Sequence, residues 1–431
     1  MLNLATRFIN YCNKVYALDQ RLSQVKDGRK KAQYSLPSLL MKMISGIVTG
    51  IRSFNQLEET VNHGIFDGIG DPDRPTADTF NYALTRLDLD SLTRVLDKII
   101  TDARRNKALD ETDVEGWRVV AIDGTGVFST HSERLGRQAH HRKGVHGENV
   151  EGDLYCEHAL AVSYVSASGV NVLLELVRVP SGQGETTTAV TVMKSLYQRH
   201  CRFCDVVTLD AGFARAPILN TLIEQNKHFV LRVKQDNYNI IKDADGLFAG
   251  QAPHEIHRDI QLKDANVVYD VEIWEDEGFT SWETVSVPLR CLKIREVRKA
   301  INAKGEVVKS QEVVTHLVTT ANRMTMKALT VWKIAHQRWD IENTGFHFLK
   351  HHFQLEHAYG YDPALIETMY KLFAITYNLF QLFVRRNLRS FRPGKDTLLG
   401  VMRRIYEGFV VLAYMMNKRW SVGDPELDVL N

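Results

Sequence analysis

Two short apolar runs, each ending on an aspartate close to a glycine, constrain the fold of this chain most. Residues 119–123 are mostly β-branched or small and end on Asp123, with Gly124 directly after. Residues 206–210 repeat the pattern and end on Asp210, with Gly212 two residues later. Such runs predict buried strands that stop at a turn. A carboxylate at the carboxyl end of a buried strand lies where α/β sheets bind ligands, although a single aspartate there often only caps a turn.

The segments around these runs alternate between strand and helix patterns. Strands are predicted at residues 158–165, 171–179 and 228–233, and helices at 186–199 and 216–225. Residues 1 to about 110 show helical spacing of apolar residues throughout, and Thr76 is placed to cap a helix that begins near Ala77. The alternation predicts an α/β sheet preceded by a helical unit.

A third acid, Glu342, lies on a predicted helix far along the chain. Arg338 precedes it by four residues, so a helix places both side chains on one face. Alone, this pair reads as an ordinary surface ion pair. Together with Asp123 and Asp210, however, Glu342 gives three hard oxygen ligands of the kind that Mg²⁺ and Mn²⁺ prefer.

These residues resemble the DDE transposases of bacterial insertion sequences. The resemblance is to the branch whose last acid lies in a Tyr-two-Arg-three-Glu-six-Lys signature, and it spans roughly residues 115–385. The Arg-Trp-x-Ile-Glu part of that pattern is matched by Arg338, Trp339, Ile341 and Glu342. Ala335 stands at the tyrosine position and Leu349 at the lysine position, with Lys350 one residue late.

The resemblance implies an α/β fold with an RNase H-like catalytic core, a β-rich insertion, an N-terminal helical domain and C-terminal helices. The long gap between Asp210 and Glu342 fits such an insertion. We therefore expect a helical domain at residues 1–112, which is a candidate for binding end DNA. The core should comprise residues 113–234 and 319–384, with the catalytic helix in the second part. The insertion should span residues 235–318, and a basic C-terminal helical region should span residues 385–431.

The resemblance also implies an activity. A transposase of this kind binds the terminal repeats of a mobile DNA element, cleaves the ends by metal-dependent phosphodiester hydrolysis and joins the freed 3′-OH to target DNA. Asp123, Asp210 and Glu342 would be the catalytic residues and the ligands of two Mg²⁺ ions, which Mn²⁺ would replace, with Asp123 bridging both. The implied partners are double-stranded DNA and a second copy of the chain, in a bacterial cytoplasm at the nucleoid.

Several further residues are expected to contact DNA. Arg338 and Lys350 would grip the phosphate near the cleaved bond, and Trp274 or Trp282 in the insertion would stack a displaced base. A basic, histidine-containing loop after the first core strand, represented by Arg142 and Lys143, suits contact with phosphates. The alternatives are that the tryptophans fill the insertion's own core and that the loop histidines bind a metal.

The offset of Lys350 predicts an irregular helix. In a regular α-helix the seventh residue after Glu342 lies nearly in line with it, and the eighth is swung away by about 80°. We expect one extra residue near Gly345, as a π-type bulge, to bring Lys350 back into line. The alternative is a solvated lysine whose role passes to His347 or His351.

The net charge is only +2, so DNA binding must come from local basic surfaces. The strongest one spans residues 385–419, with nine Lys or Arg against two acids. Five scattered cysteines show no zinc or disulfide spacing and fit a reduced compartment. No signal peptide and no membrane-spanning run is recognisable.

Two other functions remain open from the sequence. A stand-alone RNase H-like metal-dependent endonuclease would need the same three acids but not the insertion or the helical end-binding domain. A catalytically inactive DNA-binding protein derived from a transposase would be expected to have lost an acid, and all three are present.

Overall fold

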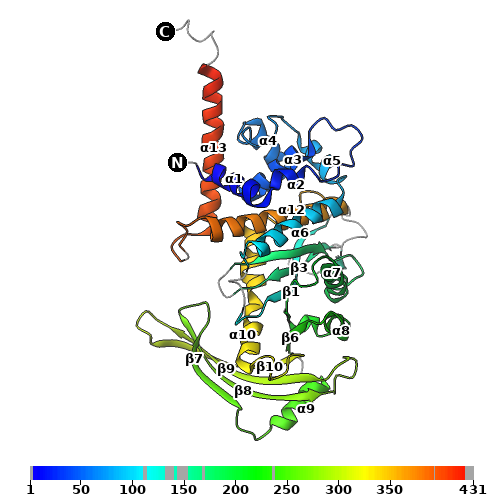
Figure 1. The fold of residues 1–431 in the computed structure, drawn as a ribbon, viewed down its shortest axis with the longest axis vertical. Helices are drawn as coiled ribbons and strands as arrows, with labels where there is room; N and C mark the ends of the chain where they lie inside the picture. Colours follow the sequence, from blue (N-terminus) through cyan, green and yellow to red (C-terminus); the bar gives the residue numbers. More distant parts are fainter. Residues whose placement is uncertain are drawn as a thin grey trace.

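The computed structural model describes residues 3–109, 114–131, 140–142, 154–166, 170–234, 238–392 and 394–422. Figure 1 shows an elongated molecule with helices at one end, a sheet in the middle and a curved sheet at the other end. The C-terminal helix α13 (Leu398–Val422) projects beyond the helical end. No helix in the described ranges is long and apolar enough to cross a membrane.

The N-terminal part is helical, as predicted. Thr76 caps α5, because its hydroxyl oxygen accepts a hydrogen bond from the Thr79 N–H at 3.3 Å. The helix α3 is buried on almost every side, and α12 (Pro363–Leu382) packs against α3, α5 and α6. The N-terminal and C-terminal helices therefore share one core. The N-terminal helices are α1 (Leu4–Tyr16), α2 (Leu18–Leu22), α3 (Leu36–Val48), α4 (Phe54–Asn62), α5 (Ala77–Leu84) and α6 (Leu89–Arg105).

The central sheet has the predicted RNase H-like topology. Its strands lie in the order β4-β3-β1-β5-β6, with β1, β5 and β6 parallel and β3 and β4 antiparallel to their neighbours. Helices α7 and α8 lie on one side of the strands and α10 on the other (Figure 1). These elements are β1 (Val119–Thr130), β3 (Leu154–Tyr164), β4 (Val172–Arg178), α7 (Glu185–Arg199), β5 (Val206–Leu209), α8 (Ala216–Glu224), β6 (His228–Val233) and α10 (Ala328–Gln337).

The first strand is longer than predicted. Its parallel pairing with β5 is recorded only as far as Ala121, but its antiparallel pairing with β3 continues to Thr130. The glycine-rich stretch after Asp123 was therefore wrongly predicted to be a turn, because pairing with a neighbouring strand overrides a weak local preference. The predicted loop that follows also contains a short strand, β2 (His140–Arg142), paired with the start of β3.

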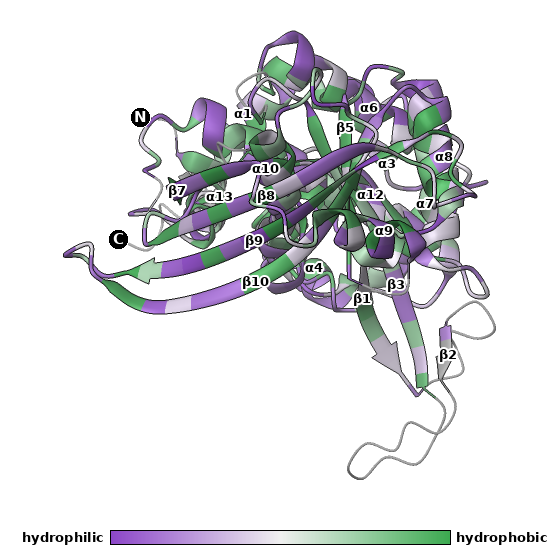
Figure 2. Cartoon of the chain, turned by 90° about the horizontal axis from the view of Figure 1, so that it is seen from below, coloured by the Kyte–Doolittle hydropathy of each residue, from purple (hydrophilic) through white to green (hydrophobic). Residues whose placement is uncertain are grey.

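The insertion is antiparallel, as expected, and it continues the central sheet. Its last strand pairs with β6 over His316–Thr319, so the curved sheet in Figure 2 is an extension of the core. The sequence also favours a strand at residues 284–287, but this segment lies in the connection between β8 and β9, so that prediction is wrong. The elements are α9 (Asn239–Phe248), β7 (Glu255–Gln261), β8 (Val267–Phe279), β9 (Leu289–Ile301) and β10 (Val307–Thr319).

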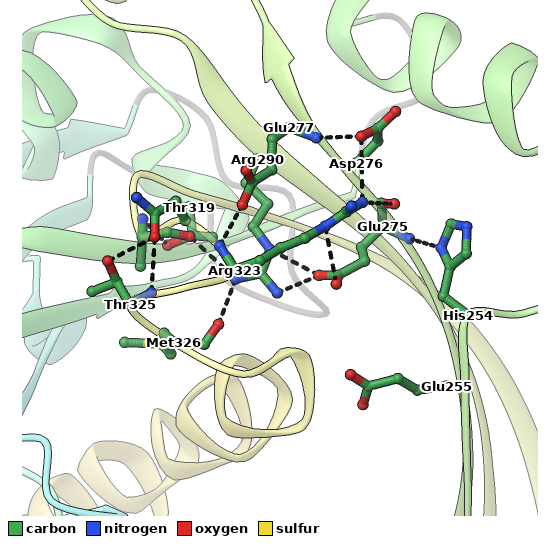
Figure 3. Close-up of polar contacts among 12 residues, drawn as sticks. His254, Glu255, Glu275, Asp276, Glu277, Arg290, Thr319, Arg323, Thr325 and Met326 are labelled. Carbon is green, nitrogen blue, oxygen red and sulfur yellow. Dashed lines mark hydrogen bonds and ion pairs between the residues drawn. The ribbon is translucent and has the colours of Figure 1, made fainter.

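A buried ion pair fixes the insertion to the segment that leads into α10. The Arg290 guanidinium, 2% exposed, donates to Glu275 Oε2 from Nε at 2.8 Å. Its Nη1 donates to the carbonyl oxygens of Ala321 at 3.2 Å and Met326 at 2.6 Å (Figure 3). Arg323 adds a contact to the other Glu275 oxygen at 3.2 Å. This network ties β8 and β9 to the start of the helix that carries the third acid.

Three short elements follow α10. A π-helical turn, η4 (Ile341–Phe346), leads into α11 (His347–His351), and α12 ends in a second π turn, η5 (Phe383–Asn387). The remaining short element, η3 (Ala211–Phe213), directly follows β5.

Candidate active site

Two of the three predicted acids lie side by side just beyond the parallel pairing of β1 and β5. The register aligns Ala121 on β1 with Thr208 on β5, so Asp123 and Asp210 are each two residues further on at the same edge of the sheet. Asp123 Oδ1 accepts the Gly124 N–H at 2.9 Å, and Asp210 Oδ1 accepts the Gly212 N–H at 2.7 Å. Each carboxylate therefore keeps its second oxygen for other partners.

Arg338 joins the third acid to the first. This arginine is 6% exposed, and its Nη1 lies 3.3 Å from Asp123 Oδ2 and 2.7 Å from Glu342 Oε1. The predicted pair between Arg338 and Glu342 is thus more than a surface contact, because the same nitrogen also reaches the strand-end aspartate. The structure brings Asp123, Asp210, Arg338 and Glu342 together from three distant parts of the chain.

The carboxylates influence one another electrostatically. Burial raises the pKa of Asp123 to about 7; the Arg338 guanidinium opposes this rise, while the charges of Glu342 and Asp210 add to it. The Asp123 carboxyl group is therefore partly protonated near neutral pH. A cation bound beside it would favour the ionised form and displace that proton.

The helix after Glu342 contains the predicted extra residue. The turn Ile341–Phe346 is a π-helix, and it includes Gly345, so the prediction of a bulge between Glu342 and Lys350 is confirmed. The Lys350 Nζ donates to the carbonyl oxygen of Gly126 on β1 at 2.8 Å. It also lies 3.2 Å from Glu356 Oε1. The lysine therefore points back to the strand that carries Asp123.

The donor set fits a divalent ion in its chemistry, since carboxylate oxygens are the ligands that Mg²⁺ and Mn²⁺ prefer. In the described ranges, no three Asp, Glu, His or Cys side chains already enclose a point where a metal would sit. Arg338 contacts two of the acids instead. Glu342, which is exposed and lies on a π turn, is paired with Arg338.

Comparisons with known proteins decide the family. A family model described as "Transposase DDE domain" matches residues 116–379, which include all three acids. The chain belongs to the DDE transposase family. A cryo-EM structure of a piggyBac transposase synaptic complex with hairpin DNA aligns at 12% identity and a TM-score of 0.43, covering 99% of this chain and 83% of that one. No curated protein matches the sequence of this transposase.

The two insertion tryptophans lie in different environments. On β8, Tyr269 packs against Trp332 of α10, and the alternation of side chains places Trp274 on the opposite face, where its indole N–H donates to the Gln251 carbonyl at 2.9 Å. Trp274 thus lies on the face of the sheet opposite to the one that packs on α10. Trp282 packs 4.9 Å from the Tyr238 ring. The hydroxyl of that tyrosine donates to the Ala214 carbonyl, just after the turn that begins at Asp210.

A pocket of about 260 Å³ opens beside Arg338, between α10 and the strands β9 and β10. Its lining includes Trp332, His336 and Trp339, and the last of these is 39% exposed. Glu296 Oε2 accepts hydrogen bonds at 2.7 Å from Trp332 Nε1 and contacts His336 Nε2 at the same distance. Aromatic side chains of α10 and of Trp339 therefore line the same pocket as Arg338.

Of the two remaining residues predicted to contact DNA, the structure describes only the backbone of Arg142. Arg142 is the last residue of β2, opposite Leu154 of β3, and nothing is described of its side chain. Lys143 lies outside the described residues. One acid that no sequence pattern above singled out, Glu185, lies at the first position of α7 and packs against Gly124. An acid in the first turn of a helix is common, so its type and position gave no signal.

Proposed function

We propose that this chain is an active transposase that binds the ends of a mobile DNA element, cleaves them and joins the freed 3′-OH to target DNA. The observation that carries the proposal is the convergence of Asp123 and Asp210 at one sheet edge, with Arg338 linking Asp123 to Glu342. Family membership supplies the reaction class.

We assign the three acids as catalytic residues that would hold two Mg²⁺ ions, with Mn²⁺ as a substitute. Bound there, the ions would activate the attacking oxygen and stabilise the leaving oxygen of the phosphodiester. Asp123, on which the charges of both other acids act, is the bridging ligand in this assignment. The pKa of Asp123 is about 7, so binding of the metal ions should compete with protonation of this carboxyl group near neutral pH.

We assign Arg338 and Lys350 to the phosphate. In the DNA-free protein, Arg338 holds Asp123 and Glu342 near each other and Lys350 is held by the Gly126 carbonyl. Both cations therefore contact β1, Arg338 at Asp123 and Lys350 at Gly126, and a phosphate could compete for them there. Trp282 remains our proposed base-stacking residue, with Trp339 as a second aromatic surface beside Arg338.

The proposed reaction also requires contacts to DNA outside the three acids. Arg142 and Lys143 would contact DNA phosphates, and the helical end-binding unit and the basic C-terminal region would add contacts to element and target DNA. We propose that two copies of the chain act together on the two element ends, in the bacterial cytoplasm at the nucleoid.

A plasmid carrying the gene with its native flanking DNA tests the proposal. Purified protein with Mg²⁺ should release the element and insert it into a second plasmid, and EDTA should stop both reactions. Cleavage without any insertion product would favour the stand-alone nuclease. Binding to the flanks without cleavage in either Mg²⁺ or Mn²⁺ would favour the inactive DNA-binding protein.

A further inference from the structure

Glu185 begins α7, the helix on the side of the central sheet opposite α10. Its carboxylate lies directly on the backbone of Gly124, the residue after Asp123. A Cβ atom added to Gly124 would lie 2.1 Å from Glu185 Cδ and 2.2 Å from Oε1. A side chain at position 124 would displace this carboxylate, which lies at the flexible end of the Glu185 side chain.

The same carboxylate is coupled to the predicted site. Burial raises the pKa of Glu185, the charge of Asp210 raises it further, and the charge of His140 opposes the rise. Asp210 acts in the same direction on Asp123. Asp210 is therefore the common neighbour of two other acids, one on each side of the strand ends.

Glu185 has no hydrogen bond or ion pair to another residue within the described ranges. A half-buried carboxylate without a donor is unfavourable unless water or a cation satisfies it. An acid that serves only the dipole of a helix N-terminus can remain in solvent. Glu185 instead packs inward, against the backbone beside Asp123 and within the electrostatic reach of Asp210.

We propose that Glu185 is a fourth acidic ligand of the divalent-ion site, acting from the α7 side together with Asp210. Three acids converge from β1, β5 and the π turn, and Glu185 adds an oxygen donor from the remaining side. The inference rests on the proposed function, because it assumes that Asp123, Asp210 and Glu342 hold divalent ions.

Binding of Mn²⁺ to the full-length, DNA-free protein tests the inference without relying on activity. The EPR signal of free Mn²⁺, titrated with protein, gives the affinity. Glu185→Gln keeps the shape and removes the charge, so the affinity should fall by about tenfold or more. Cleavage by this variant should need a higher Mg²⁺ concentration than wild type and should recover in part when Mg²⁺ is raised. Wild-type Mn²⁺ affinity and a wild-type Mg²⁺ requirement in Glu185→Gln would overturn the inference.

Gly124→Ala provides a second, independent variant. The added Cβ must displace the Glu185 carboxylate, so Mn²⁺ affinity should fall as it does in Glu185→Gln, and the two changes combined should cost little more than either alone. Gly246→Ala on α9 is the control, since a Cβ there meets no atom within 4 Å and Mn²⁺ affinity should not change. Thermal unfolding of each variant checks that it is folded. Additive losses in the double variant would contradict an action through Glu185.

The outcome also separates this inference from the function on which it rests. If Asp123→Asn weakens Mn²⁺ binding and Glu185→Gln does not, only the fourth ligand is wrong. If neither variant changes Mn²⁺ binding and the wild type cleaves no DNA, the proposed function itself fails.

Discussion

Two buried arginines, one in the insertion and one beside the acids, are used in opposite ways. Arg290 directs Nε and Nη2 to a single carboxylate, Glu275, and Nη1 to two backbone carbonyls, so its donors are distributed over fixed partners (Figure 3). Arg338 contacts Asp123 and Glu342 through the same nitrogen, Nη1. The carboxyl group of Asp123 has a raised pKa, and that of Glu342 is exposed.

The difference separates a structural ion pair from a functional one. A buried pair with saturated donors fixes the parts that it joins, and breaking it leaves buried groups unsatisfied. Acids that repel one another around a single guanidinium nitrogen are held less firmly. Such acids can exchange partners when a cation or a phosphate arrives.

The largest effect on stability is expected from Arg290. Arg290→Ala should lower the free energy of unfolding by about 3–5 kcal/mol, because Glu275 and two carbonyls lose their buried donor. Urea unfolding followed by circular dichroism measures it. Arg290→Met combined with Glu275→Leu should recover part of the loss. A change below about 1 kcal/mol in Arg290→Ala would remove the structural half of the comparison.

Substitution of Arg338 should change stability little and cleavage strongly. In Arg338→Gln, Asp123 can take up a proton and Glu342 can turn to water, so stability should change by less than about 1 kcal/mol. The cleavage rate should fall by about 10²–10³-fold, the usual cost of removing one preorganised donor from an active site. Arg338→Lys should recover only part of the rate, because a lysine cannot present two donors in a plane. A large stability loss with normal cleavage would make Arg338 structural.

The raised pKa of Asp123 predicts a pH effect on the metal-free protein. The folded pKa of about 7 exceeds the unfolded value of about 3.9, so the protonated form favours folding. This contribution is complete below pH 4 and is lost as the pH rises through 7. Between pH 5 and 8, wild type should lose about 2.6 kcal/mol of stability relative to Asp123→Asn. Added Mg²⁺ should reduce that difference. Parallel pH profiles for the two proteins would contradict the raised pKa.

Lys350 should give the smallest effect on catalysis. Lys350→Ala removes a cation that the π turn directs toward β1, and cleavage should slow by about tenfold, with stability nearly unchanged. Glu356→Gln is a useful comparison, since it frees the lysine from one of its two present partners. If Lys350→Ala cleaves at the wild-type rate, the lysine does not position the phosphate.

Local patterns predicted the elements that carry the candidate site. The apolar runs before Asp123 and Asp210 are β-branched and short, and they form the parallel strands β1 and β5. The one-residue offset of Lys350 from the lysine position of the family signature predicted the π turn, because a regular helix would turn this lysine away from Glu342.

Long-range pairing could not be predicted in the same way. The strand β1 continues past Gly124 because β3 supplies hydrogen bonds, and β10 joins β6 across the whole insertion. Neither register is encoded in a local pattern. Glu185 was missed for the same reason, since only the packing of α7 on the sheet brings it to Gly124.

Cleavage of element-end DNA by Glu342→Gln tests the central claim most directly. The assay uses the gene with its native flanks in Mg²⁺, and measures DNA binding by gel shift and cleavage by product formation on the same samples. Glu224→Gln, an exposed acid at the end of α8, is the matched control. We predict that wild type and the control cleave equally, and that Glu342→Gln binds DNA with similar affinity but forms no detectable product. Cleavage by Glu342→Gln at the wild-type rate would contradict the assignment of the three acids as the catalytic centre.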